Sequence, residues 1–319
     1  MTLKRVKCKK MTVQEFMRRQ IEGLEDDERF GTARNYRKAL NSFTEYAGDG
    51  HLSFAALTER FVAGYNAWLL RRGVVRNTVS FYMRIWRAVY NRAVGQRLVE
   101  QAFPFRHVYT GIARTRKRAV GEEVIVRLAG LDLESSRPLR LARDLFLFSF
   151  YTRGMAFVDM AYLKKTDVRD GAIRYVRHKS AQVLSVRLEP CMKEIMERYA
   201  FSGSPYVFPL LTDGGEGEAY RQYESALGYY NRCLKRLSDL LGLEQGLSSY
   251  MSRHSWASVA RNHQVPVAVI SEGMGHSSEQ TTRIYLAALE NAVIDDANRR
   301  IIEALKMKRE KGYESRGDY

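Results

Sequence analysis

The sequence predicts a mainly α-helical protein with one small antiparallel β-sheet. Apolar residues recur at helical spacing along most of the 319 residues, and a capping-box sequence at residues 12–15 marks the start of the first helix. The apolar pattern changes to alternation in two neighbouring runs, residues 172–177 and 183–188. Because only residues 178–182 separate these runs, we expect a β-hairpin that carries Lys179 at its turn.

The N-terminal part of the chain predicts a helical domain over residues 11–107. Four stretches have apolar residues at helical spacing, with Thr58 in the position of a helix cap and Gly73 in that of a helix end. No stretch in this part alternates as a strand would. A basic extension at residues 1–10 precedes the domain, and a basic linker at residues 108–118 follows it.

Arginines are frequent on the third and fourth expected helices and in the linker, and acidic residues are sparse from residue 71 to residue 97. Such a row of cations can follow the phosphates of DNA, although a solvated helix face is the alternative interpretation. The residues that we expect to contact DNA are Arg71, Arg72, Arg76, Arg84, Arg87, Arg92, Arg114, Arg116, Lys117 and Arg118.

The remainder of the chain predicts a second domain over residues 119–305 and a polar tail at residues 306–319. Apolar periodicity, proline and glycine define its expected elements. In chain order these are helices near 121–129, at 141–151 and from 157 to 163, the β-hairpin, a helix from Pro190, a mobile glycine-rich loop at 214–217, and helix from Ala219 almost to the end.

The charge balance indicates a polyanionic partner. The chain has 52 Lys and Arg residues against 36 Asp and Glu residues, a net charge of +16 at pH 7, and such a field attracts nucleic acid. An acidic membrane surface is the competing partner, but no apolar run reaches the ~18 residues that span a bilayer, and no signal peptide opens the chain. We therefore expect a cytoplasmic protein that does not bind membranes.

The cysteines and histidines do not form a metal-binding pattern. Cys8, Cys191 and Cys233 lie far apart, and the six histidines do not cluster, so neither a zinc site nor a disulfide framework is indicated. A glycine-rich phosphate loop of the kind found in ATP-driven enzymes is also missing. We expect neither a metal ion nor another cofactor.

The most informative motifs lie near the C-terminus: Arg253-His254-Ser255, Gly275-His276-Ser277-Ser278 and Thr281-Thr282-x-x-Tyr285. A tyrosine oxygen can attack a phosphodiester while arginine and histidine neutralise charge on the phosphate. In this order and spacing, the motifs resemble the catalytic core of the tyrosine recombinase (phage integrase) family. The resemblance covers nearly the whole chain and implies a helical core-binding domain followed by the family's α-rich catalytic domain.

The resemblance implies a role for each matching residue. Tyr285 would be the nucleophile and form a 3′-phosphotyrosyl bond with the cut strand. Arg253 and His276 would contact the scissile phosphate, and Lys179 would protonate the leaving 5′ oxygen. From the residues alone, Tyr285 could instead be a core aromatic and Lys179 a solvated turn residue. His254 is expected to pack rather than to catalyse.

Two positions depart from the family pattern. Tyr250 stands where the family usually has a histidine, and Ala156 stands where the family usually has its first arginine. Arg153 lies three residues before Ala156, in the turn that opens the expected helix. We therefore expect Arg153 to supply the missing cation by approaching from this turn.

These features together predict a site-specific recombinase that acts on double-stranded DNA, either a DNA invertase or a mobile-element integrase. The chain begins close to its first expected helix, which favours a simple recombinase over a larger integrase. The resemblance implies a homotetramer on two synapsed sites, and we expect a monomer free in solution and association with the bacterial nucleoid when bound. The alternatives are a DNA-binding protein of the same fold with impaired catalysis and a type IB topoisomerase.

Overall fold

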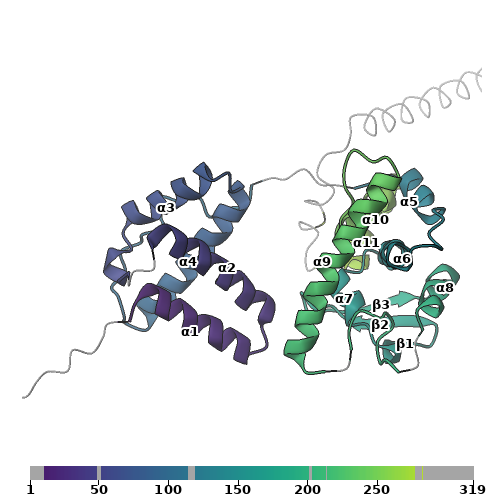
Figure 1. Ribbon diagram of the computed structural model, residues 1–319, viewed down its shortest axis with the longest axis horizontal. Helices are drawn as coiled ribbons and strands as arrows, with labels where there is room; N and C mark the ends of the chain where they lie inside the picture. The colour runs from purple at the N-terminus through teal and green to yellow at the C-terminus, as the bar shows by residue number, and fades with distance from the viewer. Residues whose placement is uncertain are drawn as a thin grey trace, which may run out of the picture. The chain divides into compact units, whose positions relative to one another are not determined.

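The computed structural model describes residues 11–48, 52–113, 119–200, 203–212, 214–276 and 282. The chain divides into two compact units, Met1–Arg116 and Lys117–Tyr319 (Figure 1). Each unit has a hydrophobic core of its own. Both units are built mainly from helices, and the second contains one three-stranded antiparallel sheet. The fold class predicted from the sequence is thereby confirmed.

Four α-helices and one short 3-10 helix form the described part of the first unit. Thr12 caps the first helix through the expected capping box, in which its hydroxyl accepts from the backbone N–H of Glu15 and the Glu15 carboxylate accepts from the backbone N–H of Thr12. Thr58 caps the third helix by accepting from the backbone N–H of Phe61. The elements are α1 Val13–Asp26, α2 Phe30–Ala47, η1 Phe54–Ala56, α3 Glu59–Arg71 and α4 Arg76–Gly95.

Aromatic side chains fill the core of the first unit. Trp86 of α4 is buried against Phe43 of α2, with ring centroids 4.1 Å apart, and Phe43 also contacts the ring of Tyr65 of α3 edge-on. Burying one side chain of this size contributes about 1.5–3 kcal/mol. Phe43 thus joins α2 to both α3 and α4 in the core.

The start of the predicted linker packs on α4. The amide of Asn77 donates to the carbonyl of Ala113 at 2.9 Å and accepts from its backbone N–H at 2.7 Å. The hydroxyl of Ser80 donates to the carbonyl of Gly111 at 2.5 Å. Residues 110–113 thus lie along α4, while residues 114–118 are outside the described part of the chain.

Seven helices, one 3-10 helix and the sheet form the described part of the second unit. The sheet has the order β1-β2-β3, and Val176 pairs with Val183 where β2 and β3 approach the turn. The elements are α5 Glu122–Ala129, α6 Arg137–Tyr151, α7 Phe157–Ala161, η2 Lys165–Asp167, β1 Val168–Arg169, β2 Ala172–Val176, β3 Val183–Arg187, α8 Pro190–Arg198, α9 Glu216–Leu240, α10 Met251–Asn262 and α11 Val267–Gly273.

Four expectations about the helices of this unit were inaccurate. Helix α7, expected to reach residue 163, ends at Ala161. Helix α6 begins at Arg137 rather than residue 141, because a proline in its first turn favours helix initiation ahead of the apolar residues. Glu216 and residue 217, expected in a mobile loop, are the first turn of α9. The helix expected onward from Ala219 is interrupted after α9 and again between α10 and α11.

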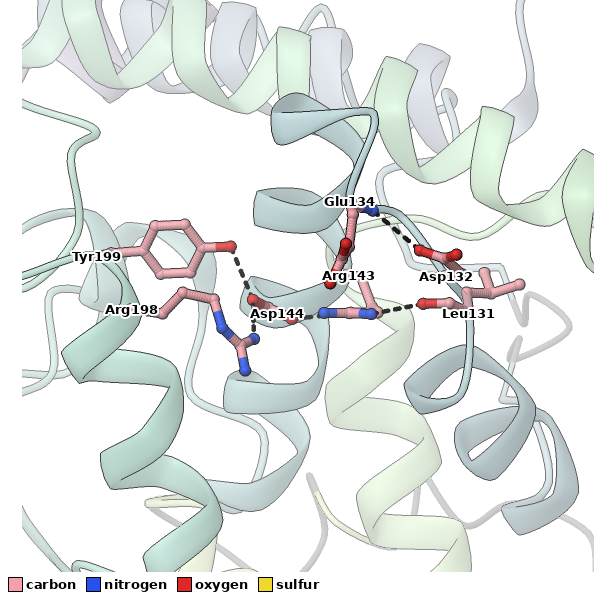
Figure 2. A network of polar contacts seen from close by, with 7 residues as sticks. All are labelled: Leu131, Asp132, Glu134, Arg143, Asp144, Arg198 and Tyr199. Carbon is pink, nitrogen blue, oxygen red and sulfur yellow. Dashed lines mark hydrogen bonds and ion pairs between the residues drawn. The ribbon is translucent and has the colours of Figure 1, made fainter.

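A polar network inside the second unit joins α6 to α8. Asp144 of α6 is buried and accepts from Arg198 at 2.5 Å and from the hydroxyl of Tyr199 at 2.7 Å (Figure 2). Arg143 donates to Asp144 at 2.9 Å and to the carbonyl of Leu131 at 2.7 Å. Because every partner of the buried carboxylate is a donor, its charge is compensated inside the protein. Helix α6 is thereby held on two sides.

Candidate active site

The site is built where the turn after α6 lies directly on α10. Gly154 in this turn has φ +77°, and a Cβ added there would lie 2.6 Å from Cγ of Arg253. Only glycine permits both this backbone conformation and this close approach. The hydroxyl of Ser149 on α6 donates to the carbonyl of Met155 at 2.7 Å and lies 2.6 Å from the hydroxyl of Ser252 on α10. These contacts fix the position of Arg253.

Arg253 is almost fully buried, with 2% of its surface exposed. Its guanidinium donates to the carbonyl of Gly154 at 2.7 Å and to the carbonyl of Met274 at 2.5 Å. The same group lies 3.0 Å from Nε2 of His276. The structure therefore brings together Arg253 and His276, two of the candidate residues.

The contacts of His276 define its tautomer. A guanidinium nitrogen can only donate, so Nε2 of His276 accepts from Arg253, and the ring proton resides on Nδ1. Nδ1 then donates to the hydroxyl of Thr282, 2.7 Å away. Thr282 is fully buried and precedes Tyr285 by three residues in the sequence. This hydrogen bond connects the imidazole to the stretch that leads to the candidate nucleophile.

His276 is neutral at physiological pH. Burial, which is the largest cause, and the charges of Arg253, Arg177 and Lys179, in that order of importance, together lower its pKa to about 4. A cationic imidazole would stand among other cations in a partly dehydrated place. His276 can therefore act as a neutral hydrogen-bonding group but not as a cation near pH 7.

Lys179 lies at the exposed turn of the β2–β3 hairpin, as predicted. The neighbouring His178 anchors this turn, since its backbone N–H donates to Asp159 of α7 at 2.9 Å and its Nδ1 lies 3.3 Å from the same carboxylate. The ring of His178 also packs on Tyr162, with centroids 4.6 Å apart. The turn is thus fixed at its base while the Lys179 side chain stays in solvent.

Arg177 is a residue of this site that the sequence analysis missed. It has 6% of its surface exposed, and its guanidinium donates to the carbonyl of Gly275 at 2.6 Å. The alternation of β2 contains a signal for it, because Ile173 and Tyr175 face the core and residue 177 continues the same parity. A charged residue in a buried register position would have marked it.

Arg153, expected to replace the missing cation, takes a different direction. Its backbone has φ +61°, and its guanidinium lies 3.5 Å from the carbonyl of Ser185 on β3. The side chain lines a hollow together with Trp256 and Val269. Ala156 is the N-cap of α7. The hydrogen bond of the Arg153 guanidinium is therefore made to the hairpin strand β3.

The two other residues weighed near Arg253 lie at the start of α10. Tyr250 is the N-cap residue of the helix and is 40% exposed. Its ring meets the ring of His254 edge-on, with centroids 5.1 Å apart. Tyr285, the candidate nucleophile, lies outside the described residues, as do Arg114, Arg116, Lys117 and Arg118.

The described arginines of the first unit differ in their surroundings. Arg72 pairs with Glu45 of α2 and covers the ring of Trp68, and Arg92 donates to the side chain of Gln20 of α1 at 3.0 Å. At about 100° per residue, Arg76 and Arg87 share one face of α4, whereas Arg92 lies about 160° from Arg76. The expected cationic row is therefore divided between faces.

Neither a metal-binding cluster nor a membrane-spanning helix occurs within the described residues. No three His, Cys, Asp or Glu side chains gather there in an arrangement that could hold a metal ion. Among the same residues, each helix is too short or too polar to cross a bilayer.

Comparison with known proteins identifies the family. The model of the phage integrase SAM-like domain matches residues 12–108, and the model of the phage integrase family matches residues 134–292. The tyrosine recombinase XerC of Halalkalibacterium halodurans is 23% identical over 272 residues, which cover 83% of this chain and 89% of XerC. The chain belongs to the tyrosine recombinase (phage integrase) family of site-specific DNA recombinases.

Solved structures have the same fold. The Tn1549 transposon integrase in complex with a circular intermediate DNA has a TM-score of 0.63 at 15% identity, over 92% of this chain and 99% of that one. The XerH recombinase bound to a palindromic difH substrate has a TM-score of 0.63 at 14% identity, over 90% and 94%. For a lambda integrase dimer bound to a core site, the TM-score is 0.61 at 15% identity, over 86% and 95%.

Proposed function

We propose that this recombinase cuts and rejoins duplex DNA through a 3′-phosphotyrosyl bond to Tyr285, and that it acts as a DNA invertase or a mobile-element integrase. The observation that supports the proposal most is the contact of buried Arg253 with His276, which is hydrogen-bonded in turn to Thr282 just before Tyr285. Attack by the tyrosine oxygen forms one phosphate ester as the bond to the 5′ oxygen breaks. The reverse attack by a 5′ hydroxyl restores DNA, so the cycle needs no external energy source.

Arg253 and His276 would stabilise the phosphate during this attack. A guanidinium presents two parallel N–H donors to two oxygens, which fits the non-bridging oxygens of a phosphate. When an oxygen accepts the N–H that now points at His276, Nε2 of the ring is released. The hydroxyl of Thr282 can donate as well as accept, so it can serve the tautomer in which Nε2 carries the proton and donates to the phosphate.

Lys179 would protonate the leaving 5′ oxygen. An alkoxide is a poor leaving group, and a general acid at this point accelerates the step by about 10²–10⁴-fold. The exposed side chain on an anchored turn suits this task, because the ammonium can reach the DNA while the base of the hairpin stays in place. The sequence proposes Arg153 for the cation missing at Ala156, but its guanidinium lies at the carbonyl of Ser185 on β3.

The partner proposed for this chain is double-stranded DNA. Residues 11–107 would form the core-binding domain, with Arg71, Arg72, Arg76, Arg84, Arg87 and Arg92 as candidate contacts, and residues 119–305 would form the catalytic domain. The solved relatives include a lambda integrase tetramer bound to a Holliday junction. We propose a homotetramer of this kind on two synapsed sites, and a monomer in solution.

A suicide substrate tests the proposed chemistry. A target duplex is first selected by binding from a random pool. It is then nicked close to the cut site, so that cleavage releases a short fragment that carries the 5′ hydroxyl and diffuses away. We expect the wild type to accumulate a covalent protein–DNA adduct and Tyr285→Phe to bind the duplex without any adduct, since only the attacking oxygen is removed. Tyr229→Phe, an exposed tyrosine of α9, is the matched control and should behave as wild type.

The other outcomes discriminate the rival functions. An adduct with Tyr285→Phe would assign the attack to another nucleophile. Binding without an adduct by the wild type would support the DNA-binding protein with impaired catalysis that Ala156 and Tyr250 suggest. Relaxation of a supercoiled plasmid without a selected site would support a type IB topoisomerase. Two selected sites in inverted or direct orientation on one plasmid then separate inversion from excision and integration.

A further inference from the structure

The side chain of Arg177 reaches from the hairpin to the turn that carries His276. Its backbone N–H donates to the carbonyl of Gln182 at 2.8 Å, so Arg177 closes the ladder at the point where the turn of Lys179 begins. Its guanidinium crosses to the carbonyl of Gly275 at 2.6 Å. Arg253 holds the preceding carbonyl, that of Met274, at 2.5 Å. Two buried guanidinium groups thus hold consecutive carbonyls directly before His276.

Within the described part of the chain, the charge of Arg177 has no acidic partner. Among the described residues, no carboxylate lies within ion-pair distance of its guanidinium. Removing a guanidinium from water is costly unless an anion compensates it, and one backbone carbonyl supplies only a partial negative charge. Nearby Asp159 contacts His178 instead. A phosphate is the anion that a DNA recombinase brings to this place.

The guanidinium of Arg177 lies beside the turn of His276, whereas that of Arg153 is hydrogen-bonded to the hairpin strand β3. Arg177 is among the groups that depress the pKa of His276, after burial and Arg253. Arg153 lies toward Ser185 and the hollow beside Trp256. Of the two arginines, Arg177 therefore has the position from which a second cation can meet the phosphate next to Arg253.

We propose that Arg177 supplies the second guanidinium to the scissile phosphate, in place of the arginine that Ala156 lacks. This proposal rests on the proposed function, because it needs the phosphate to lie beside Arg253 and His276. In the DNA-bound protein, at least one of the N–H groups not used on Gly275 donates to a non-bridging oxygen. Arg177 and Arg253 then neutralise the charge that grows on the phosphate as Tyr285 attacks.

Single-turnover cleavage of the nicked duplex tests the proposal. We expect Arg177→Ala to cleave about 10²–10³-fold more slowly than wild type, the usual loss for one oriented donor at a transition state, while binding of the intact duplex stays within about tenfold. Arg177→Gln retains a donor for the Gly275 carbonyl without the charge, and it should show the same loss of cleavage rate. It therefore tests the proposal even if the alanine variant folds poorly. Arg174→Ala removes an exposed arginine of β2, the strand that leads to Arg177, and should cleave as wild type.

A methylphosphonate at the scissile position separates a phosphate contact from a structural role. This substrate lacks the charge of one non-bridging oxygen, so fewer cations are needed, and the loss in Arg177→Ala and Arg177→Gln should shrink to about tenfold or less. Equal losses on both substrates would mean that Arg177 only holds the turn, which would overturn the proposal. Unimpaired cleavage of the normal substrate by both Arg177 variants would also overturn it. So would a cleavage defect that the methylphosphonate substrate rescues in Arg153→Ala but not in the Arg177 variants. Failure of the wild type to form any adduct would instead contradict the proposed function.

Discussion

The arginines on α3 and α4 differ from the arginines around His276 in what surrounds their guanidinium groups. On the first unit, Arg76 covers the ring of Tyr109 at 4.2 Å and Arg87 donates to the hydroxyl of Thr110 at 3.0 Å, and both side chains remain exposed. In the second unit, Arg177 and Arg253 are buried and hold backbone carbonyls.

Because their surroundings differ, the two groups of arginines are suited to two tasks, DNA binding and cleavage. An exposed arginine keeps its water and counterions, so a phosphate contact mainly exchanges one ionic partner for another, and the gain depends on salt. A buried arginine has already lost its water during folding, and it is held in one orientation before the phosphate arrives. Exposed arginines should therefore set the affinity for DNA, and buried arginines the rate of cleavage.

The largest effect on this comparison is expected from the place where Arg253 is held. Gly154→Ala should reduce the free energy of unfolding by about 2–5 kcal/mol, because alanine is strained at positive φ and its Cβ overlaps Arg253. A displaced Arg253 should also slow cleavage by about 100-fold. Denaturant unfolding and single-turnover cleavage measure the two effects.

Gly171→Ala is the control for this substitution. Gly171 has φ +68° and nothing within 4 Å of an added Cβ, so it carries the backbone strain alone, about 1 kcal/mol. Equal destabilisation by the two substitutions would show that the contact of Gly154 with Arg253 is unimportant.

A smaller effect on the stability of the second unit is expected when a fall in pH protonates His276. Its folded pKa of about 4 lies below the ordinary value of 6.5, so the unfolded chain binds more protons between these values. The contribution of His276 to stability is therefore complete above pH 6.5 and is lost as the pH falls toward 4. Arg253→Gln should raise the pKa more than Lys179→Gln, which NMR titration of the ring can measure. A wild-type pKa at 6.5 would contradict the cationic surroundings.

The smallest effects belong to single arginines of α4, the half-buried Arg84 and the exposed Arg87. Arg84→Ala and Arg87→Ala should each weaken DNA binding and reduce the slope of log affinity against log salt by about 0.9 if each contacts one phosphate. Arg37→Ala, which removes an exposed arginine paired with Glu25, should leave the slope unchanged. Wild-type slopes in Arg84→Ala and Arg87→Ala would assign both residues to a solvated helix face.

Much of the fold follows from local patterns. The capping box at Thr12, the cap at Thr58 and the alternation of β2 and β3 each need only neighbouring residues, and all three were predicted correctly. The first turn of α9 was not, because its residues are polar and the first buried position is Ala219. Apolar periodicity becomes visible only where a helix begins to face the core.

The candidate site was predictable only where motifs carry it. Arg253 and His276 belong to recognised motifs, and the structure places them side by side. Lys179 was predicted from the alternation of the two strands that flank its turn. Arg177 belongs to none of these motifs, and its significance depends on a contact with Gly275, far away in the sequence. Arg153 shows the converse, since its proximity to Ala156 along the chain does not determine where its side chain points. Direction in space comes from packing, which one sequence does not display.

The hydrogen bond from Arg177 to Gly275 also has a mechanical consequence. One residue begins the turn of Lys179 with its backbone and holds the turn of His276 with its side chain. The hairpin turn and the turn of His276 are therefore mechanically coupled through Arg177. A displacement of one turn is transmitted to the other while this hydrogen bond is intact. A movement of the Lys179 turn toward a DNA strand would therefore also shift the position of His276.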